Sequence, residues 1–155
     1  MKIFLLIDLV FLSDILRERF IVSVTGAEFG FTKGQIIQEF YCDDDVDETL
    51  RSNIEQVTGQ QLVDDLYEDV VDGAIIWWRE EDSEEEDLTD LLMDVVGNLD
   101  DSGLIWVLTP KTSLPGHVRP DEIEEAAETA GLRATSAKAM SEKWAGMRLV
   151  SRSRV

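Results

Sequence analysis

Two stretches of consecutive apolar residues stand out in the hydropathy pattern of the chain. They are Val70–Trp78 and Gly103–Lys111, both rich in branched and aromatic side chains. Apolar runs of this length between turn-forming residues are typical of strands buried on both faces. A helical stripe separates them, formed by Leu88, Leu91, Leu92, Val95, Val96 and Leu99. The order strand, helix, strand predicts a parallel sheet in which Gly103–Lys111 is the central strand.

The residues before this unit add one more strand and helix. Gln35–Phe40 predicts a first strand, preceded by a glycine-containing loop over Gly26–Gly34. Apolar residues at helical spacing between Val46 and Val57, with Gly59 just beyond them, predict the helix that follows. The connection to the next strand, residues 61–69, is expected to be short and helical or irregular.

The C-terminal third predicts a helix and two strands. Pro120 at a first helical position and Gly131 at the end bound the helix. Leu132–Met140 and Met147–Ser151 predict strands whose connection is too short for a parallel crossover, so they should form an antiparallel hairpin. We therefore expect a single three-layer α/β domain over residues 24–155, with about five strands in a mostly parallel sheet that ends in this hairpin.

Residues 1–23 differ from the rest of the chain. Ile3–Leu12 resembles the apolar core of a signal peptide, but Asp8 interrupts it and no small-residue cleavage motif follows. The segment is also too short and too charged to span a bilayer. Two interpretations stay open: a peripheral strand or helix packed on the domain, or an extension that is not native, with Val24 as the true start. We favour the second.

Charge excludes several classes of partner. The chain has a net charge of −19 and a pI near 4.2, and the acids concentrate between Tyr41 and Ser102, whereas bases concentrate after Arg133. A surface this acidic repels the phosphates of nucleic acids and anionic lipids. We therefore expect neither nucleic-acid nor membrane binding. A solvated acidic face is the simplest interpretation, and a basic protein partner stays open.

Cysteine use bears on the compartment. Cys42 is the single cysteine, so an internal disulfide is impossible. We expect a reducing, cytoplasmic location. Redox sensing by this thiol is not expected, because the acids that follow it disfavour the thiolate.

Candidate ligand-binding residues lie where the predicted strands end, since ligands of open α/β sheets bind beyond the strand carboxyl ends. Lys111 could anchor an anion, Trp78 could stack on a ring and His117 could transfer a proton. Arg79 and Thr109 lie at the same strand ends. Each residue also has a structural alternative, such as neutralising nearby acid or covering the sheet. The predicted occupant is a small molecule or a protein partner.

The motifs of cofactor and metal sites are missing from the sequence. After the first strand, a nucleotide site of the Rossmann kind needs a glycine-rich turn, but Tyr41–Asp45 contains no glycine and three carboxylates. The chain has no Walker loop, no Gly-x-Ser-x-Gly elbow and no Cys-His cluster. Asp43–Asp47 lacks the spaced ligands of a calcium loop. We therefore expect no cofactor, no metal and no catalytic residue.

The C-terminal hairpin contributes one further candidate. Trp144 and Gly146 are interpreted as a packing device, in which glycine lets the ring lie against backbone. Arg148 follows within an apolar strand and needs a partner, such as one of the many carboxylates. The alternative is that Arg148 anchors a ligand.

Taken together, several segments resemble an uncharacterised bacterial family, domain of unknown function 3052. The likeness covers residues 29–151 and rests on Gly34–Glu39, Cys42–Asp47, Trp77–Arg79, Ile105–Lys111, Gly116–Val118 and Trp144–Val150. The resemblance implies a Rossmann-like, reduced class I methyltransferase fold and a cytoplasmic location, and it carries no activity. The missing glycine turn weighs against methyl transfer.

The leading hypothesis is a non-catalytic binding or regulatory module of the bacterial cytoplasm, acting through its acidic face or its strand-end crevice. The alternative is a small-molecule-binding enzyme of the methyltransferase-like group that uses Trp78, Lys111 and His117. A third hypothesis, an acidic mimic of nucleic acid that occupies basic proteins, rests on charge alone.

Overall fold

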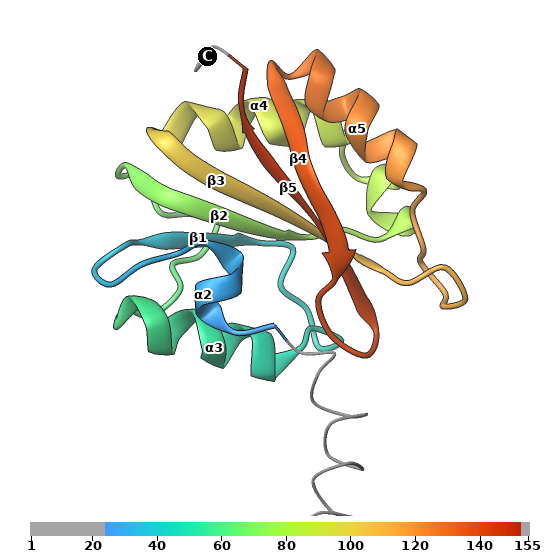
Figure 1. Ribbon diagram of the computed structural model, residues 1–155. Coiled ribbons are helices and arrows are strands. Elements are labelled where there is room, and N and C mark those ends of the chain that lie inside the picture. Colours follow the sequence, from blue (N-terminus) through green and yellow to red (C-terminus); the bar gives the residue numbers. More distant parts are fainter. Residues whose placement is uncertain (1–23, 153–155) are drawn as a thin grey trace, which may run out of the picture.

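A five-stranded sheet with helices on both faces forms the domain (Figure 1). The structure is a computed structural model that describes residues 24–152. In chain order its elements are α2 (Gly26–Phe29), β1 (Ile37–Phe40), α3 (Glu48–Thr58), β2 (Val71–Trp77), the 3₁₀ helix η1 (Glu80–Glu84), α4 (Leu88–Asn98), β3 (Leu99–Pro110), α5 (Pro120–Thr129), β4 (Leu132–Ala139) and β5 (Trp144–Ser151).

The strand order is β1-β2-β3-β5-β4, so β3 is central, as predicted. β1 pairs with β2 and β2 with β3 in parallel, whereas β5 is antiparallel to both β3 and β4. The predicted C-terminal hairpin is therefore confirmed. A mostly parallel sheet is wrong, because the two parallel pairings are matched by two antiparallel ones. Outside β1 the described chain adds a single parallel bridge, between Gln38 and Val63, instead of further strands.

Two apolar layers enclose the sheet. On one face α4 and α5 pack against side chains such as Ile76, Val107 and Met147. On the other face α2 and α3 pack against Trp77 and Trp106, both at most 1% exposed. Burial of β2 and β3 on both faces explains why these strands read as continuous apolar runs in the sequence.

Local boundaries follow the predicted signals with specific exceptions. α3 begins where Asp47 accepts a hydrogen bond from the Leu50 amide and ends at Gly59, whose φ is 72°. Residues 26–29, predicted as loop, form the short helix α2, because Thr25 and Glu28 build a capping box. β3 begins at Leu99 rather than after a turn, and β5 begins at Trp144, three residues earlier than predicted. Within the acidic loop, residues 80–84 form η1.

Gly146 packs differently from the prediction. A Cβ atom at this position would lie 2.5 Å from Met140 Cγ, so it is the Met140 side chain that needs the glycine. The Trp144 ring instead meets Trp77 edge-on, with ring centroids 4.8 Å apart.

The interpretations of residues 1–23 lie outside the described residues. Among the helices of residues 24–152, none has the length and apolar content to cross a bilayer.

Candidate functional site

The chain reverses direction across the sheet at β1. After α3 it runs along the outer side of β1, where Glu39 N donates to Val63 O (2.8 Å) and Val63 N donates to Ile37 O (3.0 Å). It then returns to β2 on the other side of β1. In open α/β sheets the crevice at such a reversal, beyond the strand carboxyl ends, is where ligands bind.

A cavity of about 590 Å³ lies at these strand ends. We call it the strand-end cavity; its walls come from the loop after β1 with the start of α3, from the loop after β3 and from the β4–β5 turn, namely Asp44–Thr49, Pro110, Leu114, Pro115 and Glu142–Trp144. Its charged side chains are carboxylates except for Lys143. All the side chains predicted to bind a ligand belong to the residues that the structure describes, and none of them lines this cavity.

Arg79 fills the space between the ends of β1 and β2. Its Nη1 donates to the carbonyl oxygens of Tyr41 (3.2 Å), which directly follows β1, and of Trp77 (3.0 Å), which ends β2. Its Nε donates to Asp45 Oδ2 at 2.7 Å, and its Nη2 donates to the other oxygen of the same carboxylate. Asp82 accepts from Nη1 at 3.2 Å and from the Arg79 backbone amide at 2.9 Å. Arg79 is 6% exposed. We predicted that it binds a ligand, but its guanidinium already forms hydrogen bonds with protein groups.

This network also holds two walls of the strand-end cavity. The Arg79 guanidinium carbon lies 5.3 Å from the centroid of the Trp144 ring, within the range of a cation–π contact. Asp45 and Trp144 both line the cavity. Arg79 therefore fixes an acidic and an aromatic wall from inside the protein.

Charge pairing decides the protonation of this network. Burial by itself would lower the pKa of Arg79, but the hydrogen bonds and charges of Asp45 and Asp82 outweigh it, and the pKa is raised. The hydrogen bonds from Arg79 hold the pKa of Asp45 below its ordinary value of 3.8. The ion pair is thus fully charged at neutral pH.

We expect Asp45→Asn to destabilise the domain at neutral pH but not in acid. Because the folded-state pKa of Asp45 is lowered, its stabilisation is present above about pH 4 and is lost as the pH falls through the folded value. The melting temperatures of the parent protein and of the variant, measured at pH 7 and near pH 3, test this expectation. The difference between the two proteins should be smaller in acid. Asp44→Asn, the same charge change one residue away, is the control; equal behaviour of the two variants would contradict the assignment.

Tyr41 occupies the position where a glycine turn would begin. Its backbone φ is 57°, a left-handed conformation that favours glycine, yet the side chain is tyrosine. The ring packs edge-on against Trp78, with centroids 5.3 Å apart, and its hydroxyl donates to Glu86 Oε1 at 2.8 Å. Burial and then the Glu86 carboxylate raise the pKa of Tyr41. The turn is therefore closed by a fixed aromatic side chain.

The other predicted site residues do not converge on one point. Trp78 is 2% exposed and packs in the layer of α4 and α5, away from Arg79 and Trp144. Thr109 is buried within β3. Lys111 lies just beyond β3, where its backbone N–H donates to Lys143 O.

His117 has a structural contact. Its Nδ1 lies 2.9 Å from Pro110 O, and because a carbonyl can only accept, Nδ1 carries the proton. The imidazole thereby ties the loop after β3 to the end of that strand.

Arg148 lies in the middle of β5, opposite Trp106, rather than at the strand ends. Its Nε donates to Thr135 Oγ1 at 2.8 Å, and the side chain is half-buried. The expected carboxylate partner is thus replaced by a hydroxyl on β4. A half-exposed guanidinium keeps contact with water, so it does not require an ion pair.

Sequence reasoning missed a buried ion pair. Glu39 is 6% exposed and accepts from Arg51 Nε and Nη2, both at 2.8 Å, and from Trp77 Nε1 at 2.8 Å. A carboxylate inside an otherwise apolar strand was the available signal. The group ties α3 to β1 and β2.

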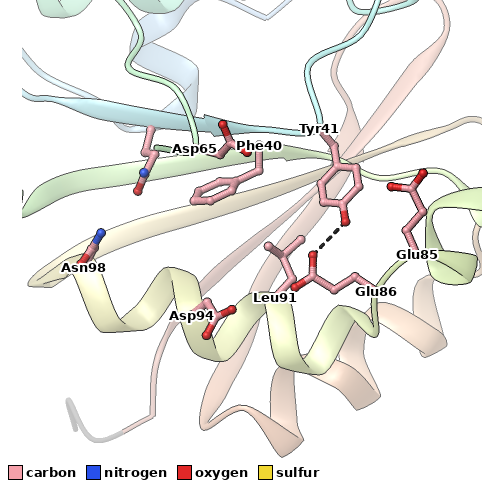
Figure 2. A pocket seen from close by; sticks show the side chains of 9 residues that line it. Phe40, Tyr41, Asp65, Glu85, Glu86, Leu91, Asp94 and Asn98 are labelled. Carbon is pink, nitrogen blue, oxygen red and sulfur yellow. Dashed lines mark hydrogen bonds between the residues drawn. The ribbon is translucent and has the colours of Figure 1, made fainter. Parts of the chain in front are cut away.

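A second pocket, also missed, lies between β1 and α4 (Figure 2). We call it the β1–α4 pocket; its volume is about 470 Å³ and it is lined by Gln38, Phe40, Tyr41, Asp65, Glu85, Glu86, Leu91, Asp94 and Asn98. Four of these side chains are carboxylates and none is a base. Among residues 24–152, no cluster of His, Cys, Asp or Glu is close enough to hold a metal ion.

The domain has a Rossmann-like α/β fold with a five-stranded mixed sheet, similar to that of methyltransferases of known structure. A TehB-like SAM-dependent methyltransferase from Corynebacterium glutamicum superposes with a TM-score of 0.53 at 15% identity, over 83% of this chain and 89% of that chain. The 1,6-didemethyltoxoflavin-N1-methyltransferase of Burkholderia thailandensis gives a TM-score of 0.52 at 12% identity, over 81% of this chain and 73% of that one. At such identities the likeness shows the fold alone.

The chain belongs to the DUF3052 family of proteins of unknown function, whose family model matches residues 26–153. The uncharacterized protein Rv2239c of Mycobacterium tuberculosis is 46% identical over 123 residues, which cover 79% of this chain and 75% of that protein. The uncharacterized protein Mb2263c of Mycobacterium bovis matches to the same extent. The resemblance seen in the sequence is thereby confirmed.

Proposed function

We propose that this chain is a non-catalytic binding module of the bacterial cytoplasm built on a methyltransferase-like fold. The carrying observation is that Arg79 bridges the carboxyl ends of β1 and β2 with its own guanidinium. A dinucleotide or adenosyl ligand of such a fold needs close approach of backbone at this point. Here the approach is blocked by a side chain that is 6% exposed.

The charge of the crevice supports the same proposal. Asp44, Asp45, Asp47, Glu48 and Glu142 face the strand-end cavity with Lys143 as the single base. Such walls repel phosphate and carboxylate groups, including the carboxylate of an amino-acid moiety. A partner that is basic, either a protein or a small molecule, suits them, whereas nucleic acid and anionic membrane do not.

A titration with S-adenosylmethionine and S-adenosylhomocysteine tests the proposal. A ligand at about 100 times its Kd stabilises a protein by about 2.7 kcal/mol, which shifts the melting temperature by several degrees in a domain of this size. We expect no shift with either compound. A clear shift with either one contradicts the proposal.

The second candidate is a small-molecule-binding enzyme of the methyltransferase-like group, favoured by the 590 Å³ cavity at the strand ends. If an adenosyl compound does bind, the Lys111→Ala and His117→Ala variants test whether Lys111 and His117 contribute to its binding. Loss of binding in these variants supports the enzyme with the roles predicted for Lys111 and His117. Unchanged binding removes those roles.

A further inference from the structure

We propose that the β1–α4 pocket binds an aliphatic cation, an ammonium group on a methylene stem. The site is separate from the strand-end cavity, so the inference holds whether or not that cavity binds an adenosyl compound. Three features of the pocket lead to it: the polarity of its walls, an unpaired buried acceptor and an apolar surface between them.

The charged groups of the pocket have one sign. Asp65, Glu85, Glu86 and Asp94 surround it from the 61–69 segment, the residues before α4 and α4 itself, as Figure 2 shows. Within the described chain none of these carboxylates has a Lys or Arg partner within 4 Å, although Glu86 accepts from the Tyr41 hydroxyl. Their charge is therefore available to a cation that enters from outside.

Gln38 provides evidence for a ligand that is independent of the acidic side chains. It lies on β1 and is 1% exposed, and its Nε2 donates to Asp64 O and Tyr67 O, both at 3.0 Å. Turning the amide over would set its oxygen against two carbonyl oxygens, so these two bonds fix the orientation. The remaining atom, Oε1, is buried and has no hydrogen-bond partner among the described residues.

A buried acceptor without a donor is unusual in native proteins and points to a missing partner. Gln38 is one of the residues that line the pocket, so the missing donor is assigned to this space. An ammonium group has three donors and no acceptor, which suits walls that carry carboxylates and an amide oxygen. A guanidinium offers the same donors in a wider, planar head.

The apolar part of the pocket lining favours a ligand whose ammonium group is carried on a methylene stem. Phe40, Leu91 and the Tyr41 ring lie between the acidic groups in Figure 2. Methylene groups contact such a surface favourably, while the charged head stays with the oxygens. A metal ion does not fit, because the described carboxylates are not clustered closely enough to coordinate it.

Two sources can supply this chemistry: a free diamine, or a lysine side chain of a protein partner. The probes are 1,5-diaminopentane and a blocked Gly-Lys-Gly peptide, titrated by calorimetry at low ionic strength against the full chain, with pentan-1-ol as the uncharged comparison. We expect saturable binding of at least one cationic probe and none of the alcohol. Binding of the diamine alone indicates a free amine, and binding of the peptide indicates a protein lysine.

Location is tested by the double variant Asp65→Asn with Asp94→Asn, two exposed positions. Each lost charge-assisted hydrogen bond corresponds to about tenfold in affinity, so the pair should weaken binding by at least that factor. The matched control, Glu124→Gln with Glu128→Gln on α5, changes the net charge equally and should leave the affinity within about twofold. In NMR spectra the Gln38 side-chain amide should shift on saturation.

Three results would overturn the proposal. The first is an absence of saturable binding by either cationic probe. The second is equal weakening by the two double variants, which indicates diffuse attraction by the net charge of −19 instead of a site. The third is unperturbed Gln38 amide resonances at saturation, which place the cation elsewhere.

Discussion

Arg79→Ala should lower the free energy of unfolding by about 3–5 kcal/mol, because several acceptors around a buried guanidinium lose their donor and each acceptor left buried without a partner costs about 1–3 kcal/mol. The guanidinium donates to the carbonyls of Tyr41 and Trp77 and to the carboxylates of Asp45 and Asp82. All of these acceptors lose a partner at once. Urea unfolding followed by circular dichroism measures the change.

Arg119→Ala is the matched control for this substitution. Arg119 is also paired with two carboxylates, Asp121 at 3.3 Å and Glu122 at 3.5 Å, but its side chain is 68% exposed. Exposed pairs of this kind contribute about 0–1 kcal/mol, so this variant should stay close to the parent. If both arginine variants lost equally little stability, Arg79 would not be the internal clamp of the crevice.

Arg79→Lys separates charge from geometry. Lysine keeps the positive charge but cannot donate to both Asp45 oxygens and both carbonyls from fixed positions. We expect it to recover only a minor part of the lost stability. Full recovery would show that the network needs a charge and not the planar fork.

Trp77→Ala should cost about 3–5 kcal/mol, the range for truncating a large aromatic side chain in a core. Trp77 is 0% exposed, meets Trp144 edge-on and donates from Nε1 to Glu39. Its removal leaves a cavity between the sheet and α3. The same urea titration, with intrinsic fluorescence as a second probe, measures the loss.

Trp77→Phe distinguishes the ring from the hydrogen bond. Phenylalanine fills most of the space but has no N–H, so Glu39 keeps only its two bonds from Arg51. The loss should be clearly smaller than for alanine, with about 1 kcal/mol assigned to the hydrogen bond. Equal losses for the two variants would argue against packing as the main contribution.

Both residues hold the strand-end region from within, since each contacts the Trp144 ring. A fold hosts many functions, and the activity depends on the groups at the site. In this family member Arg79 joins the ends of β1 and β2 in a methyltransferase-like fold, and Tyr41 occupies the position of the glycine turn. Within the described residues, the acceptor without a partner and four carboxylates without a Lys or Arg partner belong to the β1–α4 pocket.

Several elements could be predicted without coordinates because their signals are local. Continuous apolar runs predicted β2 and β3, cap residues predicted α3, and the short final connection predicted the hairpin. The missing glycine at Tyr41–Asp45 was also evident without coordinates, because that requirement concerns a few adjacent residues. These predictions depend on neighbours in the chain, which the sequence displays directly.

Which polar groups contact one another could not be predicted in this way, because it depends on long-range packing. Arg79 joins Asp45 from 34 positions away, and Gln38 donates to Tyr67 O from 29 positions away. In the sequence Arg79 was as plausible a ligand-binding residue as Lys111, because charge alone does not reveal where a side chain is buried. The balance of parallel and antiparallel pairings and the unpaired Gln38 Oε1 likewise depend on contacts between distant segments. Long-range packing therefore decided that Arg79 is committed to protein groups and that Gln38 Oε1 has no partner among the described residues.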